Sequence, residues 1–527
     1  MEALNNGTSV YHDIHTLYCR TYEGELLAAE GRNISYHGHR KTQILEVHDA
    51  IRHIVRGLVY CIQENGKGAG AFRNWIFTVF LRGTKLQPFC QTGSDENGEA
   101  RALSEEIAVI FDARLRNTLS KGDAWHSDGG RAYFVNRVYG YVEKGLPVQF
   151  GLPAFPCKSP NPRKVGGMDP DAAECLALDV LRSFIAEITE IYPTGATLWI
   201  ISDGHVFSDC IGVDDDKVTF YDDRLREIYA ERYPSAADQK AIQFKGLKEL
   251  FFSNDDLRRT FSDEWMQGHD IFHPLQTRLC DDAELSRKLM MAACEIDQDN
   301  FRALLKHGDN NTLRTYRGLS RFMLEDIAHP SFAELSSVSQ RKKLACKVAG
   351  EMIARNQAYS NLLELLFPNF IRLSIHAHPN KGPKFGIRLF SKDRVREIES
   401  LDRRHEPKPS YDFQVPTPWH NSILKVEGEK SFYLAKASVA EEAIASGRYQ
   451  GGWVDGPDGG HFNLREKPGS ESMEAHVADL ADAGFVGSKS QVPQGLQRCG
   501  MGMLVQTVKK VWACTIRWLV WILVSRP

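Results

Sequence analysis

The chain of 527 residues carries 65 basic and 68 acidic side chains, and 42% of its residues are hydrophobic. This composition is typical of a folded globular protein and excludes a disordered or fibrous one. The near balance of charge gives no sign of nucleic-acid binding, which normally shows as a basic excess. The 11 cysteines include no C-x-x-C pair, so we expect reduced thiols in the cytoplasm rather than a disulfide framework or a zinc site.

The first part of the chain predicts few regular elements. Residues 1–42 are polar, and we expect an irregular segment there. Apolar residues at helical spacing predict a helix over residues 45–62. A strand over 75–81 and a second helix over 102–116 follow.

The middle of the chain predicts a strand–loop–helix–strand unit. Residues 148–152 and 196–201 are almost wholly apolar, which is typical of buried parallel strands. Between them, Asp169 and Pro170 predict the start of a helix, as its N-cap and its first residue. The run 217–221 is a candidate for a further strand.

The following region is mainly helical in pattern, from residue 239 to residue 366. Strand patterns then occur at 371–377, 385–390, 422–426 and 432–437. Together these elements predict an α/β fold, with a Rossmann-like, mostly parallel sheet, flanking helices and a substantial helical insertion.

We expect one large domain over residues 43–467. A linker rich in Gly, Ser, Ala and Gln follows over 468–502, and an apolar tail over 503–527. A membrane-spanning helix needs about 20 mostly apolar residues, and Lys509 and Lys510 interrupt the tail. We therefore expect at most a weak membrane association through this tail.

The loop after the first buried strand is the first candidate site. It places Lys158 between prolines, followed by Ser159, Asn161 and Lys164. Basic side chains and nearby glycine amides suit a phosphate or a carboxylate, and a desolvated lysine can also form an imine with a carbonyl. The alternative interpretation is a solvated basic loop.

A second candidate lies at the end of the next strand, where Asp203 and His205 flank a glycine. Such a pair can act as acid and base, although a β-turn needs the same residue types. Both loops follow the carboxyl ends of strands, which is where open α/β sheets bind their ligands.

Two weaker groups are also basic. His376 and His378 point to one face of a predicted strand, and Lys381 and Arg388 follow. Without a nearby carboxylate, this group favours anion binding over a metal. Arg321 lies in an arginine-rich segment that could hold a carboxylate or phosphate, or could simply be a solvated helix start.

Five segments together resemble the isocyanide (isonitrile) synthase family, over about residues 40–440. They are Leu152–Asn161 with Lys164, Ser202–Asp223, Tyr316–Asp326, Ile371–Arg388 and Thr417–Lys425. The family includes bacterial pyoverdine/paerucumarin-type enzymes and fungal spore-wall dityrosine-precursor enzymes. In size the chain is similar to stand-alone fungal members.

The resemblance implies a lyase-type reaction without a metal or another cofactor. The amine of an L-amino acid condenses with the ketone carbon of ribulose 5-phosphate, and fragmentation of the sugar leaves one carbon on nitrogen as the isocyanide. We expect Lys158, Asp203 and His205 to be catalytic. The expected substrate-binding residues are Ser159, Asn161, Lys164, Asp222, Arg321, His376, His378, Lys381, Arg388 and His420. Expected partners are these substrates and downstream tailoring enzymes.

Two alternatives from other classes stay open. His126 and Asp128 have the H-x-D spacing of a non-haem iron site, with a distant histidine such as His205 as third ligand. This pattern would fit an Fe(II)/2-oxoglutarate oxygenase. The other alternative is a non-catalytic sugar-phosphate binding protein.

Overall fold

A computed structural model describes most of the chain. The described residues are the strands at 17–21, 41–49, 54–63 and 77–80, and the ranges 97–118, 122–252, 271–293, 298–327, 337–367, 370–376, 378–405 and 416–467. Residues 1–467 form one compact unit by their internal contacts. The predicted linker and tail, from residue 468 onward, lie outside the described residues.

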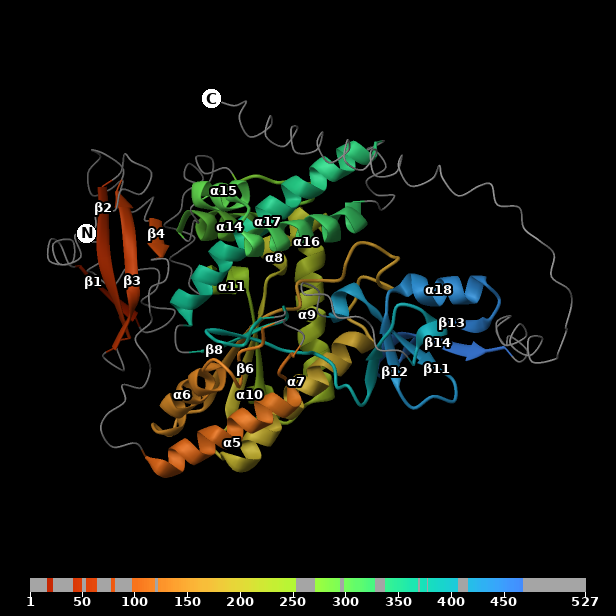
Figure 1. Ribbon diagram of the computed structural model, residues 1–527, viewed down its shortest axis with the longest axis horizontal. Helices are drawn as coiled ribbons and strands as arrows, with labels where there is room; N and C mark the ends of the chain where they lie inside the picture. Colours follow the sequence, from red (N-terminus) through yellow and green to blue (C-terminus); the bar gives the residue numbers. More distant parts are fainter. Residues whose placement is uncertain are drawn as a thin grey trace, which may run out of the picture. The chain divides into compact units, whose positions relative to one another are not determined.

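A parallel sheet of five strands is the centre of the fold (Figure 1). Its spatial order is β7-β6-β5-β8-β9, and every neighbouring pair is parallel. The strands are β5 (Val148–Pro153), β6 (Ala196–Ser202), β7 (Ile242–Gly246), β8 (Ile371–Ser374) and β9 (Lys384–Gly386). The predicted α/β fold with a mostly parallel sheet is confirmed.

Sequence explains why the central strands form where they do. Both β5 and β6 are nearly continuous apolar runs, as strands covered on both faces require. The helix between them, α7 (Ala172–Ile191), begins at a capping box: Asp171 accepts from Ala173 N, and Glu174 accepts from Asp171 N. The predicted N-cap at Asp169 is therefore wrong by two residues, because the capping-box carboxylates are Asp171 and Glu174.

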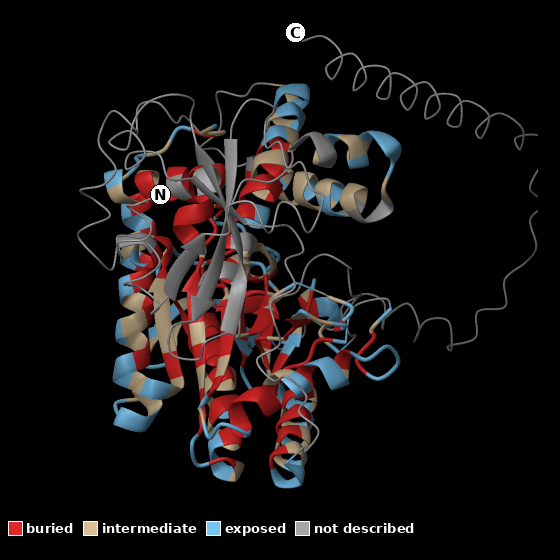
Figure 2. Ribbon diagram, turned by 90° about the vertical axis from the view of Figure 1, so that its left-hand side faces the viewer, coloured by how far each residue is buried: buried red, intermediate tan, exposed pale blue. Residues whose placement is uncertain are grey.

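Helices α5 (Gly98–Arg114) and α6 (Gly130–Val142) pack on the same core. Phe134 is the centre of an aromatic cluster there, with ring centroids 4.5 Å from Phe111 and 5.2 Å from Phe385. Figure 2 shows the buried residues concentrated in the strands and in the helix faces that cover them. The remaining helices of this part are α8 (Gly204–Ile211), α9 (Asp215–Arg232) and α10 (Ala236–Ala241).

The helical insertion lies between β7 and β8 in the chain. It contains α11 (Leu247–Phe252), α14 (Asp281–Ala293), α15 (Gln298–His307), α16 (Asn310–Ile327) and α17 (Val338–Leu366). Helix α17 packs against α8, so the insertion reaches the end of the sheet where β6 leads into α8. In the described part of the chain, no helix has both the length and the apolar character that crossing a membrane requires.

A second five-stranded sheet follows, in the order β10-β12-β11-β14-β13. Its members are β10 (Val395–Glu397), β11 (Ser422–Val426), β12 (Phe432–Ala435), β13 (Tyr449–Gly456) and β14 (Gly459–Glu466), with helix α18 (Ala437–Ala445). Sequence patterns predicted β11 and β12 but not the hairpin of β13 and β14.

Several sequence predictions are wrong. The predicted helix over 45–62 is instead an antiparallel pair, β2 (Lys41–Asp49) and β3 (Ile54–Gln63), in a sheet with β1 (Leu17–Thr21) and β4 (Phe77–Phe80). Its many β-branched residues favour strands, and their spacing happens to match a helix as well. β1 also gives regular structure to part of the segment expected to be irregular.

Two errors concern elements near the sheet. Residues 217–221, a candidate strand, lie inside helix α9. Conversely, β7 lies inside the region predicted to be helical. The short run of β7 carries too few residues to show a strand period, and its partner β6 is about 40 residues away in sequence.

Candidate active site

Loops from four parallel strands meet at one edge of the central sheet. Because β5, β6, β7 and β8 are parallel, their carboxyl ends lie at the same edge, where such sheets bind ligands. The loops after β5 and β6 are in direct contact: Ser202 Oγ donates to Phe155 O at 3.2 Å. A Cβ atom on Gly204 would lie 2.1 Å from Pro156 O, so this close approach requires glycine.

Lys158 is fully buried in this edge, with no exposed surface. Its Nζ lies 2.7 Å from Asp171 Oδ2 and 2.7 Å from Glu174 Oε2, and donates to Pro418 O at 3.1 Å. The capping box of α7 therefore also encloses the lysine. Burial alone would lower the pKa of Lys158, but the charges of Asp171 and Glu174 outweigh it and raise the pKa above its usual value.

This enclosure decides what Lys158 can do in the arrangement observed. An ammonium group held by two carboxylates stays protonated, and only a deprotonated amine can attack a carbonyl. Since three oxygens surround it and no surface is exposed, a substrate anion has no access either. The contacts favour a role in positioning the loop, which Glu174 extends to α9 by accepting from Tyr221 OH at 3.0 Å.

The next residues of the same loop contact the end of helix α16. Ser159 Oγ donates to Asp326 Oδ1 at 3.2 Å, and Asn161 Nδ2 donates to Glu325 O at 3.3 Å. Lys164 Nζ lies 2.9 Å from Asp326 Oδ1 and 4.0 Å from the centre of the Phe322 ring. These three predicted binding residues therefore connect the sheet edge to the helical insertion.

Histidines also lie in the short turn Pro418–His420 and in the segment after β8. The ring of His420 lies 4.7 Å from that of Phe322, and Nδ1 is 3.0 Å from Thr417 Oγ1. Burial, and then the nearby Lys164 and Lys158, lower the pKa of His420. After β8, His376 is exposed and His378 is partly buried, with Nε2 3.0 Å from Ser374 Oγ. Burial lowers the pKa of His378 to about 4.

Two carboxyl groups near β6 are unusually easy to protonate. Burial raises the pKa of Asp203 to about 7 and that of Asp222 to about 8. Asp203 begins helix α8 without capping it, and its Oδ1 makes no hydrogen bond with the described residues. The buried thiol of Cys157 lies close enough to both carboxyl groups for their charges to raise its pKa further than burial does alone.

His205 follows Asp203 in the first turn of α8 and is 2% exposed. Its Nε2 lies 3.3 Å from Asp215 O and 3.1 Å from Thr219 Oγ1. Burial, and then the charge of Lys248, lower the pKa of His205 to about 4. The imidazole is therefore neutral at physiological pH.

Buried arginines from the helical insertion hold α8 in place. Arg287 binds Asp215 through both terminal nitrogens, at 2.9 and 2.8 Å, and donates to His205 O at 2.9 Å. Arg355 does the same for Asp209, and donates to Val206 O at 2.9 Å. Sequence reasoning missed both arginines, because their partners are 72 and 146 residues away.

Three predicted binding residues do not join this group. Arg388 donates to Arg114 O at 3.1 Å and to Ala113 O, so it caps the end of α5. Lys381 is exposed and pairs with Asp128. Arg321 is exposed on α16 and forms no ion pair within the described ranges. These residues lie in basic segments of the sequence, but their side chains lie on other parts of the surface or contact α5 and Asp128.

The two residues of the possible iron site, His126 and Asp128, contact different partners. His126 is exposed, and its Nε2 lies 3.4 Å from Asp112 Oδ2, whereas Asp128 pairs with Lys381. Among the residues that the structure describes, no group of three or more His, Cys, Asp or Glu side chains is placed to hold a metal ion.

The fold is that of an α/β protein with buried carboxyl and imidazole side chains at the carboxyl ends of its parallel strands. Residues 138–447 match the family described as pyoverdine/dityrosine biosynthesis protein. The chain is 42% identical over 423 residues to the spore wall maturation protein DIT1 of Saccharomyces cerevisiae, which covers 78% of this chain and 76% of that protein.

Bacterial relatives are also similar. An L-tyrosine isonitrile synthase of Xenorhabdus nematophila is 32% identical over 301 residues, which is 57% of this chain and 74% of that protein. The crystal structure of the PvcA protein from Pseudomonas aeruginosa has a TM-score of 0.52 and 27% identity, over 68% of this chain and 99% of that chain. The chain belongs to the pyoverdine/dityrosine biosynthesis protein family, and the resemblance found in the sequence is confirmed.

Proposed function

We propose that this chain is an isocyanide synthase that converts the amino group of an L-amino acid into an isocyanide and takes the added carbon from ribulose 5-phosphate. The relatives named as L-tyrosine and L-tryptophan isonitrile synthases support the reaction type. The likeness to the spore wall maturation protein supports a place in spore-wall precursor or secondary-metabolite synthesis.

The observation that carries the proposal is the group of Asp203, Asp222 and His205. Condensing an amine with a ketone requires a base to deprotonate the ammonium and an acid to protonate the departing hydroxyl, which leaves as water. At neutral pH Asp222, with a pKa of about 8, is mostly protonated, and Asp203, with a pKa of about 7, is about half protonated, so either can donate a proton. The neutral imidazole of His205 can accept one. The site therefore carries both functions within one sheet edge.

The remaining residues divide by exposure. His376, His378 and His420 keep exposed surface, and we assign them to contacts with the substrate carboxylate or phosphate. Lys158, Ser159, Asn161 and Lys164 are buried in ion pairs and hydrogen bonds with the protein. These four position the loop around the reacting atoms.

The test is an incubation of the full chain with ribulose 5-phosphate and each of the 20 amino acids, beginning with L-tyrosine and L-tryptophan. The isocyanide is trapped with a tetrazine and identified by mass. With ribulose 5-phosphate labelled with ¹³C at the ketone carbon, the label should appear in the isocyanide carbon.

Each outcome tests a different part of the proposal or one of its alternatives. If no amino acid gives a product, the proposed activity is wrong, and binding of ribulose 5-phosphate without its consumption would then indicate a sugar-phosphate binding protein. An isocyanide formed without the label would contradict the carbon donor alone. Activity that disappears with an iron chelator would favour the oxygenase.

A further inference from the structure

Three polar groups from three different helices form a hydrogen-bonded chain at the β6–β7 end of the site. Lys248 Nζ donates to Thr219 Oγ1 at 3.0 Å, and Thr219 Oγ1 lies 3.1 Å from His205 Nε2. Lys248 is on α11, two residues after β7 ends; Thr219 is on α9 and His205 on α8. Among these three residues, the sequence identified His205 as a candidate but neither Thr219 nor Lys248.

The contacts of His205 assign its tautomer. The carbonyl oxygen of Asp215, 3.3 Å from Nε2, can only accept a hydrogen bond, so Nε2 carries the proton. Thr219 Oγ1 donates its own proton to the same carbonyl, at 3.1 Å. Nδ1 therefore presents a lone pair, which is buried and has no hydrogen-bond partner among the described residues. That atom can accept a proton in the reaction.

The ammonium group of Lys248 makes fewer hydrogen bonds than it has donors within the described part of the chain. Within the described part of the chain it makes the single hydrogen bond to Thr219 and no ion pair, although an ammonium group has three donors. It is partly exposed at the ligand-binding edge. The neighbouring Glu249, in contrast, is occupied by Arg226 and by Gly246 N. Lys248 is thus a cation at this edge that can take an anionic ligand without breaking an ion pair with any described residue.

We propose that Lys248 is an anion contact of the active site, and that Thr219 links it to His205, so that an anionic group of the substrate acts on the imidazole when it binds. The identity of that substrate rests on the proposed function. The shared chemistry is a carboxylate or a phosphate ester, carried by the amino acid or by the sugar phosphate.

The charges around His205 determine in which direction a bound anion shifts its pKa. The charged groups that face His205 are Lys248 on α11, Asp215 on α9 and Arg287 on α14. Burial and the two cations lower the pKa of His205, while Asp215 raises it. An anion on Lys248 neutralises one of the two cations and raises the pKa of His205 from about 4 toward neutrality. His205 thereby becomes a stronger base only when the substrate is present.

The test measures binding and His205 titration without relying on turnover. Calorimetry gives the affinities of the chain for inorganic phosphate, ribulose 5-phosphate and L-tyrosine. ¹³C-labelled histidines, with the His205 signal assigned through His205→Gln, report the imidazole titration with and without each ligand. The variants are Lys248→Met, Thr219→Val and, as a matched control, Lys217→Met, which removes an exposed lysine from α9.

We expect Lys248→Met to weaken one ligand class by about 10- to 100-fold, as the loss of a hydrogen bond to a charged group does. Loss for phosphate and ribulose 5-phosphate identifies the phosphate as the ligand, and loss for L-tyrosine identifies the carboxylate. The upward shift of the His205 titration should disappear in Lys248→Met and shrink in Thr219→Val, while Lys217→Met behaves as the natural chain.

Unchanged affinity for all three ligands in Lys248→Met would overturn the proposal, whether or not the chain makes an isocyanide. A Thr219→Val variant that keeps the full shift would remove Thr219 from it. If the ligands bind through Lys248 but no amino acid yields a product, the anion contact stands and the proposed function fails.

Discussion

At the scale of single residues, the enclosure of Lys158 leads to a stability prediction. Replacing Lys158 with Met leaves the buried carboxylates of Asp171 and Glu174 without their cation. Breaking a buried ion pair in this way costs about 3–5 kcal/mol. We expect a loss of this size in the free energy of unfolding, measured by urea denaturation.

The double variant Lys158→Met with Glu174→Gln is the companion experiment. It removes one of the stranded charges, so it should recover part of the lost stability. If Lys158→Met instead unfolds like the natural chain and loses only activity, the lysine contacts the substrate directly and our positioning role is wrong.

Asp222 leads to a prediction about pH. Its carboxyl group is buried and its pKa is about 8, so it is protonated at neutral pH and loses the proton as pH rises through that value. If Asp222 donates a proton in the reaction, kcat falls on the alkaline side with a midpoint near 8. Asp222→Asn keeps the neutral shape but has no proton to give, and should lower kcat by about 10²-fold or more.

The control for Asp222 is its exposed neighbour, in Asp223→Asn. This variant should keep both the rate and the alkaline midpoint. An alkaline limb that persists unchanged in residual activity of Asp222→Asn would assign the midpoint to another group. Such a result would remove Asp222 from the proton transfer.

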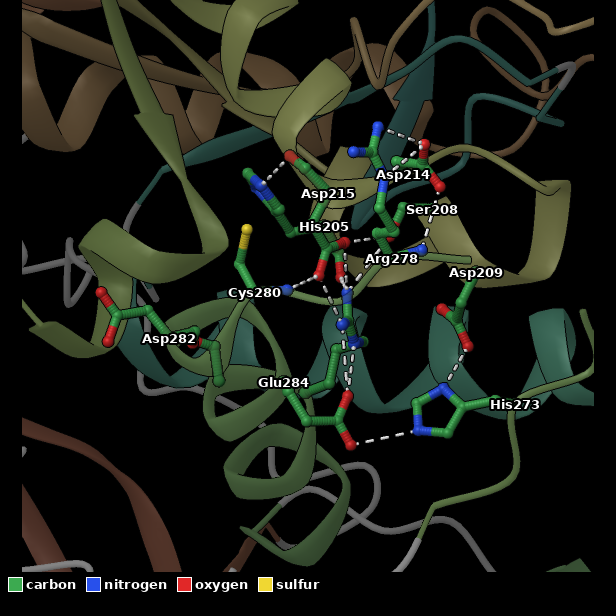
Figure 3. A network of polar contacts seen from close by, with 12 residues as sticks. His205, Ser208, Asp209, Asp214, Asp215, His273, Arg278, Cys280, Asp282 and Glu284 are labelled. Carbon is green, nitrogen blue, oxygen red and sulfur yellow. Dashed lines mark hydrogen bonds and ion pairs between the residues drawn. The ribbon is translucent and has the colours of Figure 1, made fainter. Parts of the chain in front are cut away.

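At the scale of elements, the geometry of the site depends on how α8 is held. His273 connects two acidic groups of this network, with Nδ1 2.7 Å from Asp209 and Nε2 3.1 Å from Glu284 (Figure 3). Hydrogen bonds to these carboxylates raise the pKa of His273 to about 9. Because an unfolded histidine has a pKa of about 6.5, its stabilising contribution is complete below that pH and is lost as pH rises through 9.

We therefore expect the free energy of unfolding of the natural chain to fall between about pH 6.5 and 9, and to fall less in His273→Gln. Urea denaturation at several pH values measures the difference between the two. His307→Gln, which removes an exposed histidine from α15, should retain the natural pH dependence. Equal curves for the natural chain and His273→Gln would contradict the role of the bridge.

The elements also show how far sequence reasoning could reach. The runs of β5 and β6 are long and apolar enough to identify a parallel pair, and the parallel geometry brings the loops of Lys158 and His205 together. β7 has a short, half-buried run, with a burial pattern that is interior only at its ends. Missing this strand placed Lys248 in an undivided helical region and hid it from the candidate site.

At the scale of the whole unit, sequence alone could not show which distant segments support the site. The loop after β5 is held by the short turn before β11 and by the start of α18: Ser159 N donates to Trp419 O at 2.9 Å and Ala437 N donates to Lys164 O at 3.1 Å. Such pairs are hundreds of residues apart and leave no local period. The basic character of the loop was visible in the sequence, but the burial of its lysines depends on these contacts.

The contact between the Trp453 ring and Gly166 of this loop provides a test of how the second sheet packs against the loop. A Cβ atom on Gly166 would lie 2.1 Å from the Trp453 ring. The ring packs 5.2 Å from Phe462, and its Nε1 donates to Asp455 at 3.0 Å. Gly166 N also donates to Ser422 Oγ at 3.1 Å, so the backbone is held from the same sheet.

Gly166→Ala should therefore force the second sheet away from the loop and destabilise the chain by about 1–3 kcal/mol, as overpacking does. Gly167→Ala is the matched control, because nothing lies within 4 Å of its added Cβ. Thermal unfolding and tryptophan fluorescence would record the effect, and we expect isocyanide formation to decline in Gly166→Ala because the same loop carries Lys158 and Ser159. If both variants unfold at the same temperature as the natural chain, the contact between Gly166 and the Trp453 ring does not stabilise the loop.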